Sequence, residues 1–151
     1  MRKILLLLVI VTSILYVNAQ TNDNPTFSQI ETLLKKAEGV QFWDRATNYE
    51  ITKQTFGFKS VSSAKKKVLG GNIIKTVYTD IIWPEKIDYD FWGHPDDGIM
   101  SLVIRLSENI RTIEYTNDKS QYGYLTTDTI WLYFLPKDKD TLIKLLDKLL
   151  K

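Results

Sequence analysis

The strongest constraint on the fold is a run of seven residues near the C-terminus that is apolar on both of its alternating faces. The run is Thr129-Ile130-Trp131-Leu132-Tyr133-Phe134-Leu135, and its β-branched and aromatic residues favour a strand. Successive side chains of a strand point to opposite faces of the sheet. Both faces of this strand must therefore be covered, so we expect it in the interior of the sheet, with Trp131 in the core.

Two amphipathic segments predict helices that supply this cover. From Thr26 to Ala37 apolar residues recur at spacings of three and four, and Thr26 with Gln29 forms a capping-box pattern before the stop at Gly39. The same spacing recurs from Leu142 to Leu150, after the potential caps Asp138 and Asp140. We expect both helices to pack on one face of the sheet.

Several other stretches have the composition and alternation of strands, and no long crossover separates them. They are Asn48–Phe58, Asn72–Trp83, Ile87–Phe91 and a hairpin in which Ser107–Asn109 joins Met100–Leu106 to Arg111–Tyr115. The segment Ser60–Lys67 fits either a helix or a loop, and we expect it to cover the second face of the strand 129–135. The sequence thus predicts an α+β fold: a mainly antiparallel sheet of about five strands with N-terminal and C-terminal helices packed on it.

The first residues have the pattern of a secretory signal peptide. Arg2 and Lys3 precede an apolar run from Ile4 to Val11, and small residues precede Gln20. A retained membrane anchor is the alternative, but Thr12 and Ser13 break a run that is short for a membrane span. We expect residues 1–19 to be removed, residues 20–25 to form a flexible leader, and residues 26–151 to form a single α+β domain with no stable membrane insertion.

The net charge and the cysteine content limit which partners the protein can have and in which compartment it is expected. Loss of Arg2 and Lys3 with the signal peptide would reduce the formal net charge from +2 to zero, so we expect no nucleic acid as a partner. The chain has no cysteine, which excludes a lipoprotein anchor, disulfides and a cysteine nucleophile. We therefore expect a periplasmic or secreted protein that is not a lipoprotein. The chain contains neither G-x-x-x-x-G-K-[ST] nor G-x-G-x-x-G, the glycine motifs that bind the phosphates of nucleotides, and we expect no cofactor.

The single histidine, His94, lies in a carboxylate-rich segment that runs from Asp88 to Gly98. Asp96 and Asp97 are candidate ligands for Ca²⁺ or Mg²⁺, but their spacing does not match an EF-hand, and Pro95 with Gly98 favours a surface turn without metal. A hydrolase would use His94 with Asp90 and Asp97 as its catalytic groups. No G-x-S-x-G sequence supports acyl transfer.

Tryptophans flank the same segment and suggest a binding surface, because Trp combines a large apolar area with one polar group. The candidate binding residues are Trp83, Asp88, Asp90, Trp92 and His94. The sequence favours a small exported binding protein that engages a protein partner, such as an inhibitor or an immunity-type protein. The alternatives are a metal-dependent or His/Asp hydrolase centred on His94, and a small-ligand or carbohydrate-binding module that uses Trp83 and Trp92.

Overall fold

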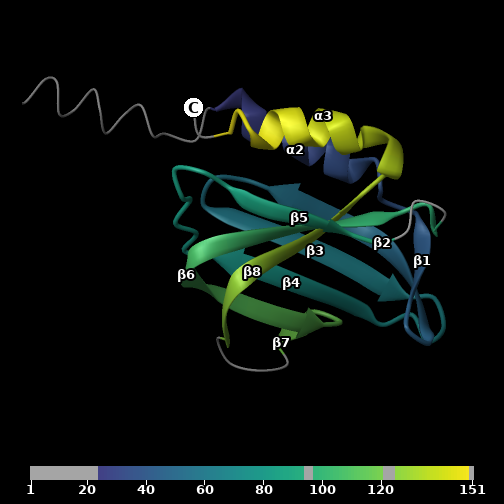
Figure 1. Ribbon diagram of the computed structural model, residues 1–151. Coiled ribbons are helices and arrows are strands. Elements are labelled where there is room, and N and C mark those ends of the chain that lie inside the picture. Colours follow the sequence, from purple (N-terminus) through teal and green to yellow (C-terminus); the bar gives the residue numbers. More distant parts are fainter. Residues whose placement is uncertain (1–23, 94–96, 121–124, 150–151) are drawn as a thin grey trace, which may run out of the picture.

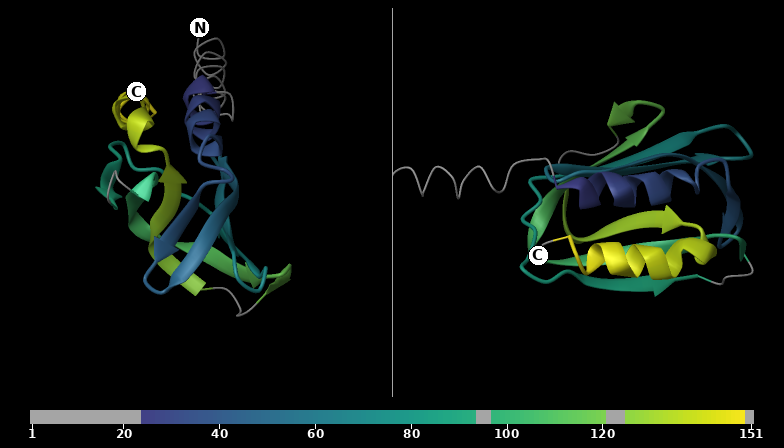
Figure 2. Two further views of the ribbon diagram at one scale, coloured as in Figure 1. Left: turned by 90° about the vertical axis from the view of Figure 1, so that its right-hand side faces the viewer. Right: turned by 90° about the horizontal axis from the view of Figure 1, so that it is seen from above.

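Among the residues that the structure describes, eight strands form one antiparallel sheet, and two α-helices lie side by side on one of its faces (Figures 1 and 2). The structure is a computed structural model that describes residues 24–93, 97–120 and 125–149. The predicted signal peptide and most of the predicted leader lie outside these residues. Among the described residues, no helix has the length and apolar character needed to span a membrane. The α+β class and the antiparallel sheet are confirmed.

The strands follow one another from the N-terminal helix to the C-terminal one. They are β1 (Gln41–Asp44), β2 (Thr47–Phe56), β3 (Ser60–Lys67), β4 (Ile73–Thr79), β5 (Asp88–Trp92), β6 (Met100–Thr116), β7 (Lys119–Ser120) and β8 (Leu125–Phe134). The helices are α2 (Pro25–Lys35) and α3 (Lys139–Leu146), with the short 3-10 helix η2 (Pro136–Asp138) before α3. The prediction of about five strands is therefore too low.

Two of the sequence predictions about strands are wrong for identifiable reasons. Residues 60–67 form β3, because β2 and β4 pair with it on both sides and override the weak strand propensity of Ser62, Ser63 and Ala64. The predicted hairpin is one strand, β6, with a bulge between Arg105 and Ile110 in place of a turn. Its first half pairs with β5 and its second half with β4, while β8 pairs with both halves.

The sheet curls under the helices, and β8 crosses the inside of the curl (Figures 1 and 2). In backbone pairing among the described residues, β8 has β6 as its single partner, so β6 and not β8 is the central strand. Alternate residues of β8 face two different environments. Ile130, Leu132 and Phe134 are fully buried, whereas Trp131 is 41% exposed.

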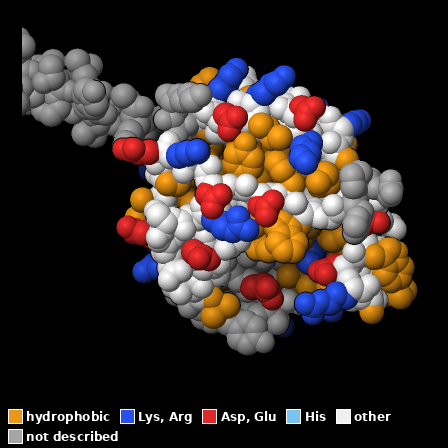
Figure 3. Space-filling view, in the orientation of Figure 1, with side chains coloured by type: hydrophobic (Ala, Val, Ile, Leu, Met, Phe, Trp, Pro, Cys, Tyr) orange, Lys and Arg blue, Asp and Glu red, His pale blue; other side chains and the backbone are white. Residues whose placement is uncertain are grey.

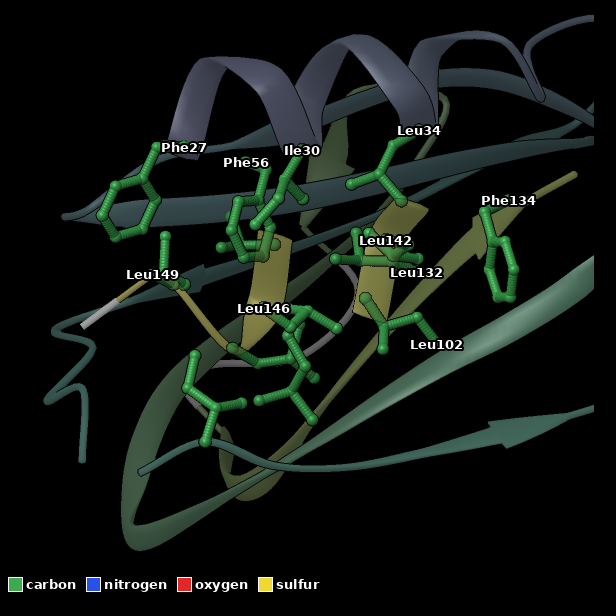
Figure 4. Packing of buried hydrophobic residues seen from close by; sticks show 14 of the residues in the cluster. Phe27, Ile30, Leu34, Phe56, Leu102, Leu132, Phe134, Leu142, Leu146 and Leu149 are labelled. Atoms are coloured by element: carbon green, nitrogen blue, oxygen red, sulfur yellow. The ribbon is translucent and has the colours of Figure 1, made fainter. Parts of the chain in front are cut away.

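The apolar core lies between the helix pair and the inner face of the sheet (Figure 4). Phe27, Ile30 and Leu34 of α2 point toward the sheet, where they meet Phe56 of β2. Leu142 and Leu146 of α3, together with Leu149, pack against side chains from β6 and β8. Both helices therefore pack against the same face of the sheet, although the N-terminal helix begins at Pro25 and ends at Lys35, not at Thr26 and Ala37.

The two helices are tied together at both ends. Asn24 caps α2, because its Oδ1 accepts a hydrogen bond from the Thr26 amide at 2.9 Å, and its Nδ2 donates to the Leu149 carbonyl at 2.8 Å. At the other end, Lys36 Nζ lies 3.1 Å from Asp138 Oδ1. Asn24 and Pro25 were expected in the flexible leader; they instead cap and begin α2, since proline is well suited to the first helical position.

The edge of β8 that faces away from β6 is held by side chains. The fully buried amide of Gln54, on β2, accepts from the Tyr133 N–H at 2.7 Å and donates to the Tyr133 carbonyl at 2.8 Å. The same Nε2 donates to the Leu34 carbonyl at 2.9 Å. On β4, the Tyr78 hydroxyl accepts from the Trp131 N–H at 3.2 Å. These two side chains satisfy backbone groups that a neighbouring strand would otherwise satisfy.

We expect Gln54→Met to lower the free energy of unfolding by about 2 kcal/mol, because Met fills similar space but leaves the Tyr133 N–H and carbonyl without their partner, whereas the Leu34 carbonyl keeps its bond from the Ala37 N–H. The matched variant Lys53→Met, at an exposed neighbouring position, should change it by no more than about 0.5 kcal/mol. Urea unfolding of both variants measures the difference. A Gln54→Met protein as stable as Lys53→Met would contradict the role assigned to Gln54.

Candidate functional site

The second face of β8 continues across β6 and β5 as one surface. In the strand register Trp92 lies opposite Ser101, which lies opposite Tyr133. Trp131 falls two residues from Tyr133 and so shares its face. The Trp92 and Trp131 rings are neighbours, with centroids 6.2 Å apart. The prediction that Trp131 is a core residue is therefore wrong.

Three of the four tryptophans in the chain line one depression, which we call the tryptophan hollow. Trp43 is 68% exposed, Trp92 54% and Trp131 41%. The hollow has a volume of about 240 Å³, and Asp44, Arg45, Asp97 and Ser101 supply its polar lining. Large exposed aromatic rings gathered at one place are typical of an interaction site.

A polar depression, which we call the strand groove, adjoins the tryptophan hollow and shares Asp44, Trp131 and Tyr133 with it. It has a volume of about 390 Å³ and lies between β3, β4, β6 and β8. Its lining is rich in hydroxyl groups and also carries charged side chains: Ser63, Thr76, Thr112, Thr127, Thr129, Tyr78, Lys65, Asp44 and Glu114. Figure 3 shows hydrophobic side chains interspersed with acidic and basic ones on the face that includes β5 and β8.

Lys65 lines the strand groove and is paired with Asp44, which lines both depressions. Lys65 Nζ lies 3.3 Å from Asp44 Oδ2 and 4.2 Å from the centre of the Tyr49 ring. Burial alone would lower the pKa of Lys65, but the neighbouring Tyr133, Asp44 and Tyr49 raise it above its ordinary value. Lys65 therefore stays an ammonium, which holds the wall of the site and is unsuited to act as a base or nucleophile.

Tyr133 on β8 and Tyr78, which bonds to β8 from β4, stay neutral over an unusually wide pH range. Burial raises the pKa of Tyr78 to about 12. Burial also raises the pKa of Tyr133, although the nearby Lys65 opposes the shift. Both groups therefore act as neutral hydrogen-bonding groups beside the strand groove at physiological pH.

The structure separates the sequence-predicted binding residues. Trp83 is partly buried against the core, where its Nε1 donates to the Phe58 carbonyl at 2.7 Å and its ring packs 5.5 Å from those of Phe27 and Phe56. Asp88 and Asp90 lie on β5 beside Arg105, at 4.0 and 3.5 Å. Trp92 lines the tryptophan hollow.

Of the candidate catalytic and metal residues, the structure describes Asp90 and Asp97. His94 and Asp96 lie outside the described residues. Asp97 lines the tryptophan hollow, whereas Asp90 is paired with Arg105. In the described part of the chain, no three acidic or histidine side chains gather closely enough to hold a metal ion. The hydrolase hypothesis stays a prediction.

Sequence reasoning missed Trp43, Trp131 and the polar wall of the strand groove. One signal was available for the groove: Thr127 and Thr129 precede Trp131 and Tyr133 at alternate positions, so this face of β8 starts polar. No such signal marks Trp43, because its exposure depends on how the short strand β1 sits beside β2.

We expect Tyr78→Phe to lower the free energy of unfolding by about 1 kcal/mol at pH 7, because the Trp131 N–H loses its acceptor. It should also reduce the loss of stability between pH 10 and pH 12. The neutral hydroxyl is favoured in the folded state, so its stabilising effect is complete below pH 10, the unfolded pKa, and disappears as the pH passes the folded pKa of about 12.

Unfolding free energies measured from pH 8 to pH 12 check this expectation. Tyr115→Phe, on the opposite face of the sheet, is the matched control for loss of one tyrosine hydroxyl. If Tyr78→Phe and Tyr115→Phe have the same pH profile, the Tyr78 hydroxyl does not hold β8 in the way described.

No protein-family model, curated protein or solved structure matches this chain. The evidence for a function therefore comes from the arrangement of the tryptophan hollow and the strand groove.

Proposed function

We propose that the mature, exported protein binds carbohydrate, with the tryptophan hollow as its ring-binding site. The observation that carries the proposal is the convergence of Trp43, Trp92 and Trp131 on one hollow that adjoins a hydroxyl-lined groove. This is the small-ligand alternative of the sequence analysis, with Trp43 and Trp131 in place of Trp83.

The aromatic part of the site suits one side of a sugar ring. A sugar ring presents C–H groups on its faces, and an indole ring offers a flat apolar surface for them. Trp92 and Trp131 are tilted by 56° to each other, so they form two sides of a corner and not one flat sheet. A ring lodged in that corner would cover apolar surface that is now in contact with water.

The polar part of the site suits the hydroxyl groups at the edge of a sugar. Within the tryptophan hollow, Ser101 can donate or accept hydrogen bonds, and the Asp97 carboxylate can accept them. Positive and negative side chains are mixed in both depressions, since Lys65 and Arg45 lie among Asp44, Asp97 and Glu114. This balance favours a neutral ligand with many hydroxyl groups over a strongly charged one.

A protein partner, which the sequence favoured, is the second candidate. The observation in its favour is the 68% exposure of Trp43, a large apolar ring that is mostly in contact with water. Protein interfaces commonly use such a tryptophan as an anchor. Affinity capture from the secreted or periplasmic fraction should then retain a protein with the parent chain and lose it with Trp43→Ala.

We expect Trp92→Ala and Trp131→Ala each to weaken sugar binding at least tenfold, which corresponds to about 1.4 kcal/mol of lost contact. The probes are β-1,4-linked glucose and N-acetylglucosamine oligomers, measured by calorimetry and by the change in tryptophan fluorescence. Ile82→Ala, which removes an exposed apolar side chain outside both depressions, should leave the affinity unchanged. Absence of binding, or binding that survives both tryptophan substitutions, would overturn the proposal.

A further inference from the structure

The tryptophan hollow and the strand groove are neighbours, because Asp44, Trp131 and Tyr133 line both of them. We propose that the ligand is a chain of sugar rings that occupies both, with one ring in the tryptophan hollow and the following part of the chain in the strand groove. This inference rests on the proposed carbohydrate-binding function and adds the length of the ligand and the residues that select for it.

The chemistry of the lining changes from the tryptophan hollow to the strand groove. In the hollow Trp43, Trp92 and Trp131 offer apolar ring faces. In the groove the lining consists largely of hydroxyls and charged groups from β3, β4, β6 and β8, with Ile74 as its aliphatic member. A single ring bound at the tryptophans would leave this second set of donors and acceptors to water, whereas a chain would use both depressions.

The strand β8 supplies a regular series of contacts along the path. Thr129, Trp131 and Tyr133 share one face of β8, and side chains at alternate positions of a strand recur about every 7 Å. Thr129 and Trp131 line the strand groove, and Trp131 and Tyr133 also line the tryptophan hollow. The series therefore runs from the strand groove to the tryptophan hollow.

The groove wall opposite β8 is suited to selecting for the later rings. Thr76 on β4 lies directly beside Glu114 on β6 in the sheet register, and both line the strand groove. Among the described residues, Glu114 takes part in no salt bridge, so its carboxylate has acceptor positions for ligand hydroxyls. Neither residue lines the tryptophan hollow, so changes at these positions should affect long ligands selectively.

The test is calorimetric titration of the full mature chain with glucose and N-acetylglucosamine oligomers of one to six rings. In the series that binds, the affinity of the parent protein should rise at least tenfold with length and then become constant. Thr76→Val, which keeps the β-branched shape but removes the hydroxyl, and Glu114→Ala should weaken binding of the longest oligomer fivefold or more. These two substitutions should leave single-ring binding unchanged, whereas Trp131→Ala should weaken the binding of the single ring and of the longest oligomer. Thermal melting of each variant checks that it is folded.

The outcomes separate this inference from the function on which it rests. Affinity that does not depend on length, or groove variants that bind long oligomers as the parent does, would overturn the inference and leave a single-ring site at the tryptophans. Groove variants that weaken single-ring binding would also overturn it, because they would place that ring in the groove. If neither series binds at all, the proposed function fails and the inference fails with it.

Discussion

Within the described residues, β8 has no partner strand along one of its edges, and the structure depends on the side chains that satisfy the backbone groups of that edge. Adjacent strands in a sheet lie about 4.8 Å apart, which leaves no room between their backbones. Gln54 and Tyr78 instead reach from β2 and β4 to the Trp131 and Tyr133 backbone groups with their side chains. Because a whole side chain lies between the two backbones, β8 is farther from β2 and β4 than a directly paired strand would be. The strand groove occupies part of the resulting space.

This placement divides the inside of the curled sheet into two compartments. On one face of β8, Ile130, Leu132 and Phe134 join the core beneath α2 and α3, where apolar burial provides most of the stabilisation. On the other face, Tyr133 packs against Phe42, with ring centroids 5.1 Å apart, and Trp131 reaches solvent. The helix pair, tied at its ends by Asn24 and Lys36, keeps the apolar compartment closed. The same strand therefore builds the core and the site.

The parts of this fold that were predictable from the sequence are those set by local pattern. The strands β2, β4 and β5 follow from β-branched and alternating residues, and the helices follow from their apolar spacing. The strand β3 was not predictable, because its serines and lysines carry no strand signal and its neighbours impose the conformation. Ser107–Asn109 resembles a turn in composition, but pairing of β6 with β8 on either side of it makes it a bulge.

The site was less predictable, because it depends on contacts between residues distant in sequence. Trp83 looked suited to a surface, yet its indole N–H finds an acceptor at Phe58, and α2 covers its ring. Trp131 looked suited to the core, yet the face of β8 that carries it borders the strand groove and not the helices. The alternation of a strand shows which side chains share a face, but it does not show what lies opposite that face.

Hydrogen exchange of individual backbone amides tests the central claim most directly. The Trp131 and Tyr133 N–H groups point away from β6, so a strand with an unsatisfied edge would exchange them rapidly. The account predicts that both amides are strongly protected in the parent protein, and that Gln54→Met selectively lowers the protection of the Tyr133 amide. Rapid exchange of both amides in the parent protein, or protection of Tyr133 that is unchanged in Gln54→Met, would contradict it.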